Sequence, residues 1–156
     1  MASLGQCDLL KVRLYNNLLR AKAARNAQSL SYLRELTRAI AEAKKSAPDD
    51  AETKQIYVSA RLTQLLYEGN RAVVTKSDLD AAVSALNARP NDGLNHANVG
   101  AYYWLASKTP RMGNLIAQAV EHFHQAVKLN PLLGITFREE IGAAEALLAT
   151  RNGSKP

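Results

Sequence analysis

Three prolines recur along the chain at nearly equal intervals, and this spacing limits the fold more than any other feature of the sequence. Pro48, Pro90 and Pro131 lie 42 and 41 residues apart, and an alanine stands five residues before each one. Proline ends helices because it lacks a backbone N–H and its ring clashes with the preceding turn. A period of about 20 to 50 residues is typical of stacked helical units that cannot bury their apolar faces alone. The spacing therefore predicts repeated pairs of helices.

Composition supports helices over strands, because 47% of the residues are apolar while only 6% are aromatic. Hydrophobic periodicity predicts a first helix over residues 3–25 and six further helices that end near Ser46, Glu68, Ala88, Ala106, Leu129 and Thr150. Capping patterns predict where three of these helices start. Asp49 and Asp50 can cap the first of them, with Glu52 three residues after Asp49, and the other two pair Ser77 with Asp80 and Thr136 with Glu139. Asn91 and Asp92 are expected to cap the helix that follows Pro90.

The last proline-ended helix carries Ala119, Phe123, Ala126 and Pro131, a face of small and large residues that allows another helix to pack closely. This order resembles the second helix of a tetratricopeptide (TPR) repeat, and the run Val99, Gly100, Tyr103, Trp104 resembles its first helix. The close match covers Gly100–Pro131 only, and the earlier units have Ile40 and Ala82 where the family has an aromatic residue. The interval of about 41 residues exceeds the usual TPR length of about 34, so HEAT-like pairs stay open.

The resemblance implies an all-α fold, a right-handed α-α superhelix of about three TPR-like helical pairs plus a C-terminal capping helix, seven helices in total. We expect a single repeat domain over residues 1–151, with units at about 3–48, 49–90 and 91–131, a cap at 135–150, and a disordered tail at 152–156.

TPR proteins bind an extended peptide or a partner helix in a concave groove, and the resemblance assigns that groove to Leu94, Ala97, Ala101 and Trp104. The residues that clamp a terminal carboxylate in some TPR co-chaperones are missing from these positions, which disfavours a chaperone tail as the ligand. Structural packing is the competing role for Trp104, since large aromatic residues at helix interfaces mostly pack. The sequence thus predicts a non-enzymatic scaffold or adaptor for another protein or peptide.

The chain is basic, with a net charge of +6, and the excess lies toward its N-terminal third. In the first predicted helix Lys11, Lys22 and Arg25 fall near one another, which raises an acidic polymer such as nucleic acid as the alternative partner. A solvated helix is the competing interpretation, because Arg13 and Arg20 fall on the opposite side and no aromatic residues are interleaved for base stacking.

Residue types that carry catalysis or bind metals do not form a recognisable motif. His122 and His124 are two apart on one helix and His96 is on another, so metal ligation is not expected, and Cys7 stands alone. We therefore predict no catalytic residues, no metal and no cofactor. No run of about 18 to 20 apolar residues and no secretory signal is visible, so a cytoplasmic chain without a membrane span is expected, although removal of a leader would leave the same sequence. Helix 3–25, apolar on two sides, suggests a possible homo-oligomer contact through the terminal helices.

Overall fold

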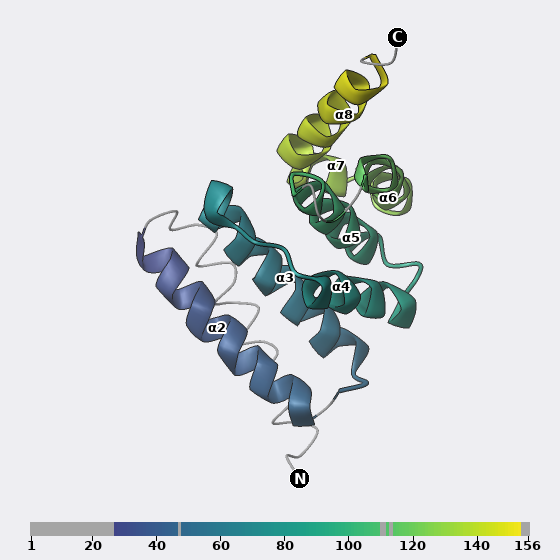
Figure 1. Ribbon diagram of the computed structural model, residues 1–156. Helices are drawn as coiled ribbons and strands as arrows, with labels where there is room; N and C mark the ends of the chain where they lie inside the picture. The colour runs from purple at the N-terminus through teal and green to yellow at the C-terminus, as the bar shows by residue number, and fades with distance from the viewer. Residues whose placement is uncertain (1–26, 47, 110–111, 113, 154–156) are drawn as a thin grey trace. The chain divides into compact units, whose positions relative to one another are not determined.

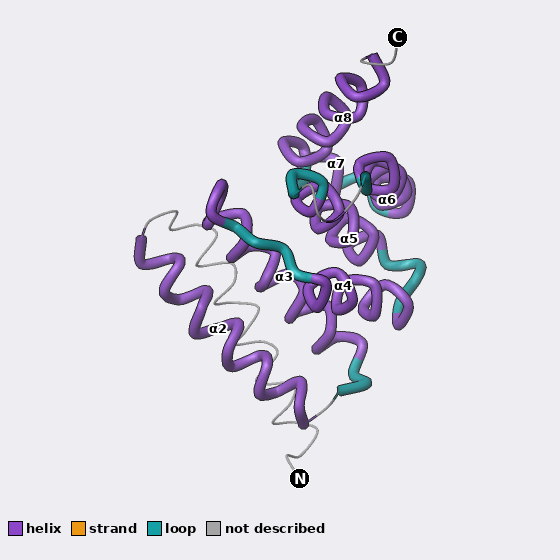
Figure 2. The backbone as a smooth tube through the Cα atoms, viewed as in Figure 1, coloured by secondary structure: helices purple, strands orange, loops and turns teal. Residues whose placement is uncertain are grey.

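The computed structural model describes residues 27–46, 48–109, 112 and 114–153, and all regular structure in this part of the chain is helical. In order, the elements are α2 (Ala27–Ser46), α3 (Ala51–Glu68), the 3-10 turn η1 (Gly69–Arg71), α4 (Lys76–Ala88), α5 (Gly93–Ala106), α6 (Ile116–Leu129), α7 (Leu133–Thr136) and α8 (Arg138–Gly153) (Figures 1 and 2). The all-α prediction is confirmed. The predicted helix 3–25 lies outside the described residues, as do Cys7 and positions 154–156.

The three prolines stand just beyond helix ends, as predicted. Pro48 follows α2, Pro90 follows α4 and Pro131 follows α6. The repeat also appears in burial, because Ile40, Ala82 and Phe123 hold the same position relative to these prolines and each is at most 1% exposed. Positions spaced by the proline interval therefore share one role, which is to fill the core beneath their helix.

The predicted helix starts need three corrections. Asp50, not Asp49, caps α3, and its carboxylate accepts hydrogen bonds from the backbone N–H and the hydroxyl of Thr53. The capping box of α4 is formed by Thr75 with Asp78, because Thr75 has the extended backbone of a cap.

The third correction concerns Thr136, which does not start the last helix. It ends the short α7, and its hydroxyl donates to the carbonyl of Leu132 instead of capping. In each case the capping pattern lay in the right region. Several neighbouring hydroxyl and carboxyl side chains there have a suitable spacing, so the sequence does not single out the residue that serves as the cap.

The chain divides into two compact units, residues 1–72 and 73–156, which are described separately. In the first unit α2 and α3 form an antiparallel hairpin. Its direction follows from two contacts, Arg34 with Glu68 at 3.9 Å and the Lys44 ammonium 4.7 Å from the centre of the Tyr57 ring. Its core is built from Ile40, Ile56 and Ala60, with Tyr57 and Tyr67 packed against it.

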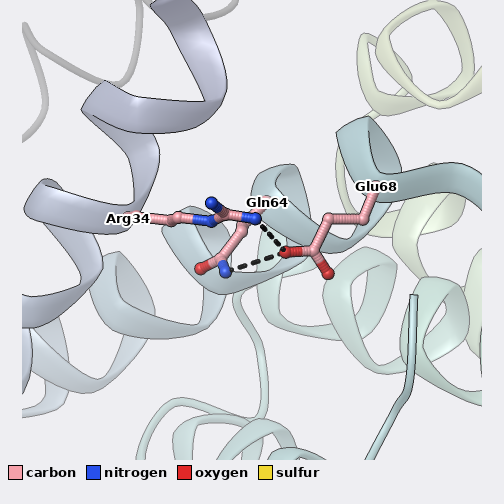
Figure 3. Close-up of polar contacts among 3 residues, drawn as sticks. All are labelled: Arg34, Gln64 and Glu68. Atoms are coloured by element: carbon pink, nitrogen blue, oxygen red, sulfur yellow. Dashed lines mark hydrogen bonds and ion pairs between the residues drawn. The ribbon is translucent and has the colours of Figure 1, made fainter. Parts of the chain in front are cut away.

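A polar contact also joins the two helices of this hairpin. Figure 3 shows Arg34 reaching from α2 toward the carboxylate of Glu68 on α3, where the side-chain amide of Gln64 donates to the same oxygen at 3.1 Å. The Arg34 side chain is 60% exposed, so this ion pair lies in water and contributes little to stability.

In the second unit α5 is the central helix, packed against α4, α6, α7 and α8. Two glycines on α5 set its closest approach to α6. A Cβ atom built on Gly100 would lie 3.0 Å from the carbonyl oxygen of Ala119 and 3.0 Å from the ring of Phe123, and one on Gly93 would lie 3.0 Å from the carbonyl oxygen of Ala126. The bare Cα atoms of these glycines thus allow the two helices to pack closely, and α5 and α6 are antiparallel.

The other helices of this unit pack around the α5–α6 pair. Tyr102 and Phe123 are almost completely buried, and the ring of Phe137, which precedes α8, lies 6.3 Å from that of Phe123. At the other end of α8, Arg151 donates to the side chain of Asn114 and to the carbonyl oxygen of Ser107, which ties the helix to the loop between α5 and α6. None of the described helices combines the length and the apolar character that crossing a membrane requires.

Candidate functional site

The sequence-predicted groove residues all lie on α5, within about 80° of its circumference at 100° per residue. Ala97 and Ala101 are fully buried, whereas Leu94 and Trp104 are only half-buried. Of these four side chains, only Leu94 and Trp104 are therefore accessible for direct contact with another molecule. The two buried alanines instead allow α5 to pack closely within its own unit.

Local interactions fix the start of α5. The carboxylate of Asp92 accepts the backbone N–H of Leu94, as its predicted capping role requires. Asn95 is 1% exposed, and its side-chain amide donates to the carbonyl oxygens of Ala85 and Arg89 at the end of α4. These bonds hold the turn around Pro90 against the first turn of α5, and so they hold the position of Leu94.

Trp104 lies near the other end of α5 and is the only tryptophan in the chain. The Lys108 ammonium lies 4.1 Å from the centre of the Trp104 ring. A cation over the face of an indole ring is attracted by the ring quadrupole, and this attraction restrains the Trp104 side chain. A pre-positioned, half-exposed indole is well suited to contact with another molecule, since little side-chain freedom is left to lose.

A second cluster, which the sequence did not predict, joins His96 of α5 to His122 of α6. The two Nδ1 atoms are 3.2 Å apart, and the Nε2 atom of His96 lies 2.7 Å from the carbonyl oxygen of Pro90. The ring of Tyr103 meets His122 edge to face, with ring centres 5.7 Å apart. Partial burial lowers the pKa of His122, the charge of His96 lowers it further, and the carboxylate of Glu121 acts in the opposite direction.

The antiparallel register of α5 and α6 could have indicated this pair. Gly100 packs opposite Ala119, so each step back along α5 is matched by a step forward along α6. His96, four residues before Gly100, therefore falls opposite position 123, beside His122. Gly100 was the sequence signal that two helices pack closely here. The sequence did not show that Ala119 is its partner, and this pairing fixes the register.

The third histidine occupies a different place. His124 is exposed, and its Nε2 atom lies 2.9 Å from the carboxylate of Glu145 on α8. In the part of the chain that the structure describes, no three or more His, Cys, Asp or Glu side chains gather around a common point. The predicted basic residues Lys11, Lys22 and Arg25 lie outside the described residues.

Comparisons of the chain with models of known protein families, with curated proteins and with solved structures found no match. The site therefore has to be interpreted from its own chemistry. α5 offers an apolar side chain and a fixed indole ring on one face, together with a pair of imidazoles at its packing interface with α6.

Proposed function

We propose that the chain is a TPR-like helical repeat scaffold that binds a peptide or partner helix along the exposed part of α5, without catalysis. The observation that carries this proposal is that Leu94 and Trp104 keep accessible surface on the central helix of the second unit. Large apolar and aromatic side chains that stay accessible on a rigid element are the usual anchors of a protein interface.

The dimensions suit a short peptide. Leu94 and Trp104 are ten residues apart, which corresponds to roughly 15 Å along a helix and to about four or five residues of extended chain. The cation over Trp104 adds a constraint, because Lys108 brings a positive charge to that end of the face. We therefore infer a ligand with apolar side chains and an acidic group near the Trp104 end.

Repetition also supports the proposal. Ile40, Ala82 and Phe123 are buried at intervals of 42 and 41 residues, as expected for units of one design. Such units, in a right-handed superhelix, would present the face of α5 on the concave side. HEAT-like pairs would give a different curvature but the same kind of partner.

The test begins with peptides selected from a random library on the intact chain. Their binding to Trp104→Ala and Leu94→Ala is measured by fluorescence anisotropy of a labelled peptide, with helix content checked by circular dichroism. We expect each substitution to weaken binding by about tenfold or more, as for anchors worth at least about 1.4 kcal/mol. Leu132→Ala is the matched control, because this leucine is exposed and is not part of α5, so its removal should leave binding unchanged.

The salt dependence of the binding affinity distinguishes this function from its alternative. Contact with an acidic polymer through the N-terminal basic residues would give a steep loss of affinity between low and moderate salt, because counterions are released from phosphates. Binding in the groove predicts an affinity that depends only weakly on salt and that falls in Trp104→Ala. An affinity that depends steeply on salt and is fully retained in Trp104→Ala would contradict the proposal.

A further inference from the structure

The hydrogen bonds around the His96–His122 pair define which ring nitrogens carry protons. The carbonyl oxygen of Pro90 can only accept, so the Nε2 atom of His96, 2.7 Å away, must donate and carry a hydrogen. In the neutral ring the Nδ1 atom of His96 is then a bare acceptor. The hydrogen between the two Nδ1 atoms, 3.2 Å apart, therefore belongs to His122.

This is an arrangement that metal-binding histidines use. A histidine ligand commonly donates its second ring N–H to a backbone carbonyl, which fixes the tautomer and directs the bare nitrogen to the ion. Two imidazole nitrogens on one tetrahedral zinc ion lie roughly 3.3 Å apart, given Zn–N distances of about 2.0–2.1 Å. The observed separation of 3.2 Å is close to this value. The two rings also come from helices whose spacing is set by Gly93 and Gly100, so the site is held by the core of the unit.

We propose that His96 and His122 form a two-histidine site for a divalent transition-metal ion, bound through the Nδ1 atom of each ring, with water completing the coordination shell. The ion replaces the hydrogen that the two rings share. That proton moves from the Nδ1 atom to the Nε2 atom of His122, so both rings stay neutral and no net proton is released. No electron is transferred.

The rings must turn slightly to accept the ion. Their centres are 5.4 Å apart and their planes differ by 32°, which places the two nitrogens nearly end to end, as in the hydrogen bond. A bound ion lies to one side of the line between the nitrogens, so each ring rotates about its Cβ–Cγ bond, a torsion with broad preferences in histidine. Both side chains are only partly buried, so water can reach the pair.

A nearby charge and the ligand type favour a transition-metal cation at this site. The Glu121 carboxylate acts on the His122 ring with a negative charge. Imidazole ligands suit copper, zinc and nickel, and copper should bind most tightly of the three.

Zinc is the probe for the test, because it has no redox chemistry of its own. The full, untagged chain is titrated with Zn²⁺ against a chelating indicator dye at pH 7.5, in a Cys7→Ser background that removes the single thiol. We expect one ion per chain. The affinity for Zn²⁺ should fall about tenfold or more in His96→Gln and in His122→Gln, since loss of even an outer-shell partner costs about 10- to 100-fold. His124→Gln is the matched control from the same helix and should bind as the parent does.

A second measurement does not depend on how well the variants fold. Imidazole ¹⁵N spectra of the parent chain should show the Nδ1 signals of two of the three histidines shifting on addition of one equivalent of Zn²⁺, while the third stays in place. Assignment of the shifted pair to His96 and His122 supports the site. No binding of one ion per chain, a shift that includes His124 in place of either ring, or equal affinity in all three glutamine variants would overturn it.

Discussion

Two antiparallel helix pairs in the described part of the chain, α2 with α3 and α5 with α6, are joined in different ways. The α5–α6 pair is held by backbone contact, because Gly93 and Gly100 remove the side chains that would keep the helices apart. The α2–α3 pair is held through side chains, with an apolar contact between Ile40 and Ile56 and an exposed polar contact from Arg34 to Glu68. Helix pairs within one chain can therefore differ in how strictly their spacing is fixed.

This difference has consequences for function. Backbone-close packing gives a fixed register, and in the α5–α6 pair that register brings His96 and His122 together and leaves Leu94 and Trp104 half-exposed. Contact through long side chains tolerates small shifts, since side chains can adopt other rotamers at modest cost. We therefore place both proposed sites on the α5–α6 pair.

Substitution of the packing glycine should have the largest effect. Gly100→Ala places a methyl group 3.0 Å from the Ala119 carbonyl oxygen and from the buried Phe123 ring, neither of which is the free end of a flexible side chain. We expect the free energy of unfolding to fall by about 1–3 kcal/mol, because overpacking outweighs the better helix propensity of alanine. Urea unfolding followed by the fluorescence of Trp104, the single tryptophan, reports on this unit directly.

The control for this substitution is Gly142→Ala on α8, where a new Cβ atom would meet nothing within 4 Å. It should leave stability unchanged or raise it by about 0.4–1 kcal/mol. Equal effects at the two glycines would show that the α5–α6 pair is not fixed by backbone contact, and the comparison with α2–α3 would fail.

Acid should have a smaller effect, confined to the α5–α6 pair. The pKa of His122 is lower in the folded chain than its usual value near 6.5, so the unfolded chain binds more protons once the pH drops below about 6.5. Stability is then fully present above that pH and is lost progressively as the pH falls through the folded pKa. Unfolding measured by Trp104 fluorescence between pH 7.5 and 5 should show this loss, by less than the loss in Gly100→Ala.

Several titratable side chains of the helices packed together here have contacts of their own. His96 and Glu121 act on His122, Glu145 of α8 is paired with His124, Asp78 of α4 is used in a capping box, and α7 carries no titratable side chain. His122→Gln should therefore flatten the dependence between pH 6.5 and 5, whereas His124→Gln should preserve it. A pH dependence that persists in His122→Gln would assign the effect to another group.

The smallest effect is expected in the α2–α3 pair. Arg34→Ala removes an exposed ion pair with Glu68 and should cost about 0.2–1 kcal/mol at low salt, less at high salt because the interaction is screened. Amide hydrogen exchange of α3 can follow it, with Lys45→Ala, which removes the more exposed pair with Glu42 within α2, as the control. A loss as large as that of Gly100→Ala would remove the contrast between the two pairs.

The sequence by itself determined the helical class, the C-terminal ends of the helices that proline terminates, and the buried repeat positions. Proline stops a helix through its own covalent structure, and Asp92 caps α5 through a bond to a residue two positions on, so neither depends on distant parts of the chain. The apolar periodicity that marks Phe123 as core is equally local.

Tertiary structure alone decided which residues stand opposite one another. His96 and His122 are 26 positions apart, and their contact depends on how far one helix is shifted along the other. The spacing of residues within one helix gives no information about this shift. The same holds for Ala97 and Ala101, whose full burial depends on the helices packed around α5. Helix ends follow from bonds between near neighbours, whereas sites follow from the register of packing, which only the close approach at Gly93 and Gly100 fixes.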